Sequence, residues 1–255
     1  MRAVRILIEQ PTASYRIRQS LEIKESYPLP PYSTVIGMIH AACGFQEYVP
    51  MQVSIQGDVV SHVQELYTRY EFGNGTKYEP PSGNFTRHNV KIHTEDRDYG
   101  ILKSVGKAEL LVDVTLVIHI VPEDDSMCEI IMEGLRYPKK YLSLGRHEDL
   151  AVIREIQMTE LIETCLEEPM KLGNSAWIPE FIEKRWRKES DTAAIGTSYR
   201  LTKRFEVTKK NLRKWTEIVT AKFAGRETEI CEGATVVLDK LPMNGKNEAM
   251  PVFLN

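Results

Sequence analysis

Short apolar runs, separated by polar and proline-rich segments, outline the elements that this chain is expected to form. Val4 to Glu9 (VRILIE) alternates towards apolar and β-branched residues, which predicts an opening strand that ends at Pro11. Val53 to Tyr70 alternates as a second strand, and Leu110 to Val121 (LLVDVTLVIHIV) has the clearest strand pattern in the sequence. The first half of the chain is therefore rich in predicted strands.

Two segments have the apolar spacing of helices instead. VIGMIHAACG follows the proline cluster YPLPPY (Tyr27 to Tyr32), and Gly44 is a suitable C-terminal stop for it. Ser33 or Thr34 is a suitable N-cap for this first helix. The segment from Asp124 to Leu135 has an acidic first turn and the same apolar spacing, which predicts a second helix.

The order of these elements predicts the fold class. Tyr141 to Leu144 is expected to be a short strand, which completes the order β-α-β-β-α-β of a ferredoxin-like or RRM domain. RNA binders and small metabolic domains both use this arrangement, so the fold by itself does not identify the function. We predict an α+β fold with this domain over residues 1–155 and a smaller, mainly β C-terminal domain over residues 156–255. A helical piece near Ile156 to Glu168 and a strand over TSYRLTKRFEV are expected in the second domain.

A long polar segment interrupts the first domain. Residues 71–107 are rich in Gly, Asn, Pro, Tyr and charge, have no sustained apolar period, and are too many for an ordinary connection. They predict a projecting hairpin or arm. Aromatic residues are interspersed with its basic ones, as in an RNA-facing finger that stacks bases. These basic residues are Arg69, Lys77, Arg87, His88, Lys91, His93 and Arg97.

The charge of the chain is distributed unevenly. The net charge of −3 is not that of a free-standing nucleic-acid binder, so any nucleic-acid surface has to be local. Residues 184–214 hold eleven Lys or Arg against three acids, with aromatic residues such as Phe205 and Trp215 between them. That mixture suits phosphate neutralisation with base stacking, and it suits a solvated basic face equally well.

Membrane, metal and cofactor classes have no support in the sequence. No stretch reaches the about 18 apolar residues of a membrane span, and MRAVRILIEQ meets a charge before a signal-peptide core can form. We therefore expect a cytoplasmic protein without a membrane partner. Cys43, Cys128, Cys165 and Cys231 lie far apart without a C-x-x-C pair, so we expect no metal site, and no cofactor motif is present.

Three segments carry a resemblance to a known family: YPLPPYSTVIGMIHAACG (Tyr27 to Gly44), YLSLGRHEDLAVI (Tyr141 to Ile153) and the C-terminal PVFL (Pro251 to Leu254). Together they resemble the proline-rich entry to the first helix, the L-G-R segment and the closing strand of the Cas five family of CRISPR-associated RAMP proteins. The resemblance covers roughly the first 155 residues well, and the residues of the motifs look closer to the type I-B branch than to others.

The resemblance implies a non-catalytic subunit of a type I Cascade surveillance complex, which acts in defence against foreign DNA. Such a subunit grips the 5′ handle of the guide RNA (crRNA), contacts the backbone subunit through an extended thumb and sits beside the large subunit. Target DNA is then a partner in the assembled complex. Residues 71–107 fall where the thumb would be.

Several residues are candidates for the RNA contacts. The start of the first helix offers unpaired amides that can seat a phosphate, although a plain N-cap explains the same residues. Arg146 can clamp a phosphate or stack on a base, and Arg16 and Arg18 would face one way on an extended segment. A surface ion pair is an alternative role for these last two. The candidates are Arg16, Arg18, Ser33, Thr34, Arg69, Arg87, Lys91, Gly145, Arg146 and His147.

An enzymatic hypothesis stands beside the favoured one. One branch of the resembled family is a metal-independent endoribonuclease that processes CRISPR repeat RNA with a tyrosine, a lysine and a histidine. Tyr32 with Lys91 and either His88 or His93 supplies these residue types here. The alternative function is therefore cleavage of repeat RNA, with a general base within reach of the attacking 2′-hydroxyl.

Overall fold

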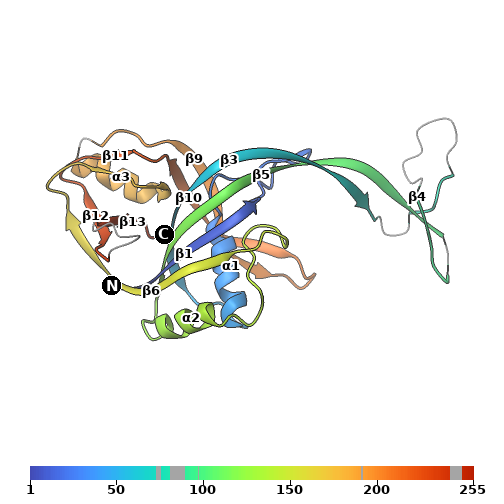
Figure 1. The fold of residues 1–255 in the computed structure, drawn as a ribbon, viewed down its shortest axis with the longest axis horizontal. Helices are drawn as coiled ribbons and strands as arrows, with labels where there is room; N and C mark the ends of the chain where they lie inside the picture. Colours follow the sequence, from blue (N-terminus) through green and yellow to red (C-terminus); the bar gives the residue numbers. More distant parts are fainter. Residues whose placement is uncertain (73–75, 81–89, 97, 191, 242–248) are drawn as a thin grey trace.

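The structure is a computed structural model that describes residues 1–72, 76–80, 90–96, 98–190, 192–241 and 249–255. The chain is mostly β, with a curled sheet that is antiparallel except where β2 joins it (Figure 1). The order in this sheet is β13-β12-β6-β1-β5-β3-β8-β10-β9, with β2 and β4 paired to β5. The described residues include no helix long and apolar enough to cross a membrane.

The first half of the chain supplies the centre of the sheet. Its strands are β1 (Arg2–Ala13), β2 (Ile23–Lys24), β3 (Met51–Glu71), β4 (Val90–His93) and β5 (Asp98–Pro122). The helices are α1 (Tyr32–Cys43) and α2 (Met127–Arg136), and β6 (Val152–Cys165) follows. Without the short β2 and β4, the order is β-α-β-β-α-β, as the sequence predicts. The four long strands lie in the order β6-β1-β5-β3.

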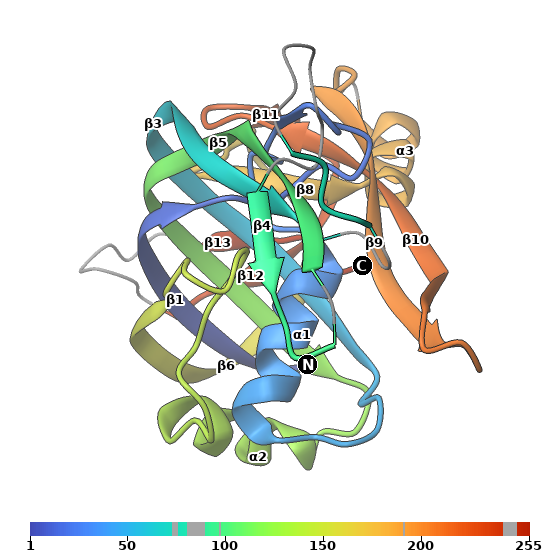
Figure 2. The same ribbon diagram turned by 90° about the vertical axis from the view of Figure 1, so that its right-hand side faces the viewer.

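The two helices pack against each other, with α1 beside β3 and β9 and α2 beside β1, β5 and β6 (Figure 2). Their buried residues recur at helical spacing, such as Val35 and Ile39 on α1 and Ile131 and Leu135 on α2. These side chains join the largest core cluster, in which Ile118 of β5 is fully buried. The two predicted helices are confirmed on this evidence.

The start of α1 differs from the prediction. Pro31 is the N-cap, in an extended conformation with φ −62° and ψ 153°, and no side chain caps the helix. A proline lacks the N–H that a helix start leaves unpaired in any case, so the rigid loop can lead directly into Tyr32. Ser33 and Thr34 therefore lie inside the first turn and are not N-caps. Gly44 ends the helix as predicted, in the left-handed region at φ 71°.

Two further predictions about elements are wrong. Ile156 to Glu168 is not helical, because β6 pairs with β1 on one side and with β12 on the other. Tyr141 to Leu144 is not a strand and contributes only an isolated bridge between Ser143 and Leu150. The strand that completes the β-α-β-β-α-β order is therefore β6.

β1 also continues beyond Pro11. Its pairing with β5 reaches Ala13, whereas its pairing with β6 ends at Glu9. The segment around Pro11 is consequently an edge on the β6 side, where the missing N–H of a proline costs little.

The predicted arm is present. β3 and β5 pair in one register from Met51 and Pro122 to Glu71 and Leu102, apart from a break where Val60 lies opposite Asp113. Their outer parts leave the body as a two-stranded ribbon with β4 at its end (Figure 1). Most side chains from Val60 to Tyr70 are exposed, so the ribbon begins nearer the body than residue 71.

The second half of the chain extends both edges of the central strands. β8 (Ser175–Pro179), β10 (Arg213–Ala224) and β9 (Thr197–Val207) continue the sheet beyond β3, and β12 (Thr235–Asp239) and β13 (Met250–Val252) continue it beyond β6. β7 (Met170–Lys171) and β11 (Glu229–Ile230) form a separate pair, and α3 (Glu180–Glu189) packs on β8, β10 and β12. The strand predicted over TSYRLTKRFEV is confirmed as β9. β6 runs through residue 155, and the division into two domains there stays a prediction.

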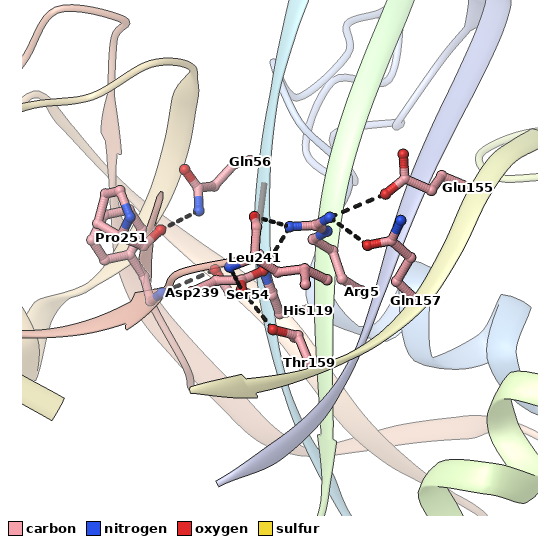
Figure 3. Close-up of polar contacts among 11 residues, drawn as sticks. Arg5, Ser54, Gln56, His119, Glu155, Gln157, Thr159, Asp239, Leu241 and Pro251 are labelled. Atoms are coloured by element: carbon pink, nitrogen blue, oxygen red, sulfur yellow. Dashed lines mark hydrogen bonds and ion pairs between the residues drawn. The ribbon is translucent and has the colours of Figure 1, made fainter. Parts of the chain in front are cut away.

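A buried polar network joins these additions to the central strands (Figure 3). Asp239 of β12 accepts hydrogen bonds from Arg5 of β1 at 3.0 Å and from Thr159 of β6 at 2.6 Å. Its carboxylate also lies 2.9 Å from His119 of β5. The C-terminal segment is held similarly, since Gln56 donates to the carbonyl of Pro251 at 2.6 Å.

Candidate nucleic-acid interface

A cavity of about 1010 Å³ opens on one side of α1. Four parts of the chain line it: the segment after β1, the region from the first turn of α1 to Tyr48, the loop from Lys140 to His147, and the hairpin of β9 and β10. Ser33 of α1 and Thr202 of β9 share a hydrogen bond of 2.7 Å between their hydroxyls. The two halves of the sequence therefore meet at this cavity.

The lining of the cavity is basic and aromatic. Six Lys or Arg side chains line it, and Glu47 is the one acid among the lining residues that the structure describes. Five Tyr, Phe or Trp rings face the same space. A cavity of this kind concentrates positive potential on a chain whose net charge is −3, and its rings offer surfaces for stacking.

Six of the predicted RNA-binding residues lie together here, although they come from three separate segments. They are Arg16, Arg18, Ser33, Thr34, Gly145 and His147. His147 lies edge-on against Tyr141, with 5.4 Å between the ring centres. The sequence therefore identifies much of one wall of the cavity.

Arg146 has a different environment from the one predicted. Its Nη2 donates to Asp149 Oδ1 at 2.7 Å, and its Nη1 lies 3.2 Å from Glu148 and 3.6 Å from Glu65. The hydrogen bond that Arg146 donates to Asp149 raises the pKa of Arg146 above its usual value. Its donors are thus directed at carboxylates, and the side chain is not among those that line the cavity.

Asp149 organises the loop that carries Gly145 and His147. Its carboxylate is fully buried and accepts hydrogen bonds from the backbone N–H of Ser14 at 2.9 Å and of Arg146 at 2.7 Å. Gly145 has φ 112°, and a Cβ there would lie 2.8 Å from Asp149 Oδ2 and 3.0 Å from the carbonyl oxygen of Ser14. The L-G-R segment is therefore a tight loop. The Asp149 carboxylate holds it against Ser14, and Gln10 of β1 donates to the carbonyl oxygens of Leu144 and Asp149.

The predicted contacts on the arm lie away from the cavity. Arg69 pairs with Glu71 at 3.0 Å, and Lys91 and His93 both contact Asp98 at 2.6 Å. Arg87 lies outside the described residues. The arm and the cavity are therefore two separate candidate surfaces.

The residues of the enzymatic alternative are not brought together. Tyr32 is fully buried at the start of α1, and burial raises the pKa of its hydroxyl. Lys91 and His93 lie on β4 of the arm and are largely exposed, and His88 lies outside the described residues. Among the described residues, no group of three or more His, Cys, Asp or Glu is arranged to hold a metal ion.

The residues of the opposite wall of the cavity are not among the site residues predicted from the sequence. The hairpin of β9 and β10 contributes six residues there: Thr202, Lys203, Arg204, Phe205, Arg213 and Trp215. Its signal was the mixture of basic and aromatic residues in 184–214. That segment divides in the structure, because Lys184 and Arg187 lie on α3, where they pair with Glu180 and Glu183.

A family model agrees with the resemblance found in the sequence. Residues 3–217 match the model of the family described as CRISPR-associated protein (Cas_Cas5). A solved chain titled "CRISPR RNA-guided surveillance complex" is 14% identical with a TM-score of 0.49, over 88% of this chain and 91% of that one. A chain titled "Crystal structure of Cas protein" is 12% identical with a TM-score of 0.42, over 96% and 100%.

A third solved chain, a CRISPR protein from Archaeoglobus fulgidus, is 10% identical with a TM-score of 0.44, over 99% of this chain and 100% of that one. The comparison with curated protein sequences gives no match.

Proposed function

Because this chain belongs to the CRISPR-associated Cas5 family, we propose that it is a subunit of a type I surveillance complex that binds and caps the 5′ handle of the guide RNA. It does so in the cytoplasm and without cleaving the RNA. The observation that carries this proposal is the basic, aromatic cavity between α1 and the β9 and β10 hairpin. Positive side chains neutralise phosphates there, and the rings beside them stack on bases.

The fold supports the same proposal. The strand order β6-β1-β5-β3, with α1 and α2 packed together, supports the assignment of this part of the chain to the ferredoxin-like domain that the family resemblance implies. The L-G-R loop forms part of the cavity wall through Gly145, and the helix entry segment does so through Ser33 and Thr34. Two of the segments that carry the family resemblance therefore meet at one site.

The arm supports a role in assembly. It is a two-stranded ribbon that projects from the body, and it exposes large apolar side chains such as Leu66, Tyr70 and Phe72. Exposed apolar surface of this kind is typical of protein contacts. We propose that the arm is the thumb that contacts the backbone subunit, with the large subunit and target DNA as further partners in a type I-B-like complex.

Capture of RNA and partners by the tagged full chain tests the proposal. The chain is expressed with the proteins and repeat RNA of its CRISPR locus and purified through the tag, and the bound RNA is sequenced from its 5′ end. Guide RNA is expected to co-purify, and the pair Lys203→Ala and Arg204→Ala is expected to reduce it. Arg154→Ala is the control, since Arg154 pairs with Glu9 on the surface outside the cavity. Undiminished RNA in the cavity variant would contradict the proposal.

A further inference from the structure

Two rings of the cavity are paired with arginines from its opposite wall. Trp215 lies on β10, and the guanidinium carbon of Arg18, from the segment after β1, lies 5.4 Å from the centre of its ring. Tyr48 lies between α1 and β3, and Arg204 of β9 lies over it at 4.5 Å. The two cation–π pairs therefore cross the cavity in opposite directions.

Neighbouring rings hold these two platforms in place. Phe205 meets Trp215 edge to face, with 5.5 Å between the ring centres and 74° between the planes. His40 stacks on Tyr48 at 5.8 Å with 24° between the planes, and it accepts a hydrogen bond from the amide of Val49 at 3.4 Å. The rings are consequently oriented by packing before any ligand arrives.

A guanidinium lying over a ring occupies the place that a nucleobase can take. Both are planar and both stack on aromatic faces. A strand of RNA also brings phosphates, which pair with arginine more strongly than an exposed ring does. Entry of a strand therefore allows an exchange: the arginine turns to a phosphate, and a base replaces it on the ring.

We propose that Trp215 and Tyr48 are stacking platforms for unpaired bases of an RNA strand, and that Arg18 and Arg204 move from these rings to its phosphates. This proposal rests on the proposed function and adds that the bound RNA is single-stranded. The bases of a duplex are stacked on each other and do not present a free face, so the cavity selects single-stranded RNA.

The tryptophans of the chain make this exchange measurable. The sequence contains three, and Trp177 and Trp186 are 0% and 1% exposed. Their indole N–H groups donate to the carbonyl oxygens of Pro30 and Thr235. Trp215 is half-buried and lines the cavity, so it is the tryptophan whose emission a ligand in the cavity changes directly.

The experiment titrates the full chain with three oligonucleotides: a short single-stranded RNA, the same strand with abasic sites, and a blunt RNA duplex. Tryptophan emission is recorded, and affinity is measured separately by anisotropy of labelled RNA. The single strand is expected to quench the emission and to bind more tightly than the abasic strand or the duplex. Trp215→Ala is expected to weaken binding of the single strand about tenfold.

Trp215→Phe tests whether the effect of Trp215→Ala comes from lost stacking or from misfolding. The variant keeps an aromatic ring at this position and removes the tryptophan emission. It is expected to lose the quenching and to retain most of the affinity that Trp215→Ala loses. Phe181→Ala is the matched control, since Phe181 is an exposed aromatic on α3 that does not line the cavity.

Three results would overturn the inference. Equal affinities for the intact and abasic strands, with Trp215→Ala unchanged, would leave RNA binding in place and remove base stacking. Tighter binding of the duplex would show that the cavity recognises paired RNA. Absence of binding to all three oligonucleotides would overturn the proposed function together with this inference.

Discussion

His119 Nε2 lies 2.9 Å from Asp239 Oδ2, although 120 residues separate the two in the sequence and neither side chain is exposed. The same carboxylate oxygen accepts a hydrogen bond from Arg5 at 3.0 Å. Because these partners lie on β5 and β1, Asp239 fastens β12 to the centre of the sheet (Figure 3). Stability of the fold is therefore expected to depend on this one carboxylate.

Replacement of Asp239 by alanine is expected to lower the free energy of unfolding by about 2 kcal/mol or more, because Arg5 and Thr159 lose a buried acceptor while Glu155 still pairs with Arg5. Urea denaturation measures the effect. Glu129→Ala is the control, since Glu129 pairs with Arg2 on the surface, and it is expected to change little. Equal stability of the two variants would show that the network does not hold β12.

Stability is expected to fall as the pH decreases from about 6.5. Burial lowers the pKa of His119, an effect that its hydrogen bond to Asp239 only partly offsets. The unfolded chain therefore takes up a proton below about pH 6.5 that the folded chain does not, and unfolding is favoured. Urea midpoints between pH 7.5 and 5 measure this, and His119→Gln should show a flatter dependence than the wild type. Identical slopes would assign the effect to other groups.

A second loss of stability is expected at lower pH. Burial opposes ionisation of Asp239, but hydrogen bonds from His119, Thr159 and the amide of Leu241 outweigh it and hold its pKa below the usual value. A carboxylate of this kind stabilises the fold above about pH 4, its unfolded pKa, and the stabilisation is lost as the pH falls further. In Asp239→Asn this part of the acid unfolding curve is expected to flatten.

Replacement of Asp149 by asparagine distinguishes two roles for Arg146. If Arg146 positions the loop through Asp149, both Asp149→Asn and Arg146→Ala should weaken RNA binding, roughly tenfold. If Arg146 is itself the RNA ligand, Asp149→Asn frees its guanidinium and should strengthen binding. Anisotropy of labelled guide RNA measures the affinity of each variant, and the control Arg154→Ala is expected to change the affinity little. We expect both Asp149→Asn and Arg146→Ala to weaken binding.

Removal of residues 73–100 is expected to leave the body folded. Glu71 and Leu102 are paired, so a short Asn-Gly turn can close the ribbon beside them. Among the described residues, none between Val59 and Leu111 belongs to the three core clusters. The free energy of unfolding, measured by urea denaturation, is expected to change by less than about 1 kcal/mol, since little core surface is lost. Assembly with the backbone subunit is expected to fail, whereas aggregation of the isolated variant would place the arm in the core.

Incubation with labelled repeat RNA in a chelator is expected to yield no site-specific cut. The rival mechanism needs no metal, so the chelator removes contaminating metal nucleases without affecting it. Cleavage that disappears in Lys91→Ala, His88→Ala or His93→Ala would make the protein an endoribonuclease, contrary to the proposed function.

Local patterns identify the elements whose contacts are themselves local or strongly alternating. The apolar spacing before Gly44 predicts α1 because the helix hydrogen bonds join near neighbours. The segment that became β6 shows the limit of this reasoning. Val152–Cys165 has no clear period, and it is a strand because β1 and β12, distant in the sequence, both present free edges to it. Strand pairing of this kind depends on the path of the whole chain.

Local patterns were enough to predict the two helices, three long strands, the arm, the family resemblance and much of one wall of the cavity. That Trp215 and Arg204 face Arg18 and Tyr48, and that Arg146 is directed at Asp149, is visible in the folded chain alone. The difference lies in how far apart in the sequence the interacting residues are. Backbone conformation follows from neighbouring side chains, whereas the environment of a charge or a ring depends on which distant segments the folded sheet brings beside it.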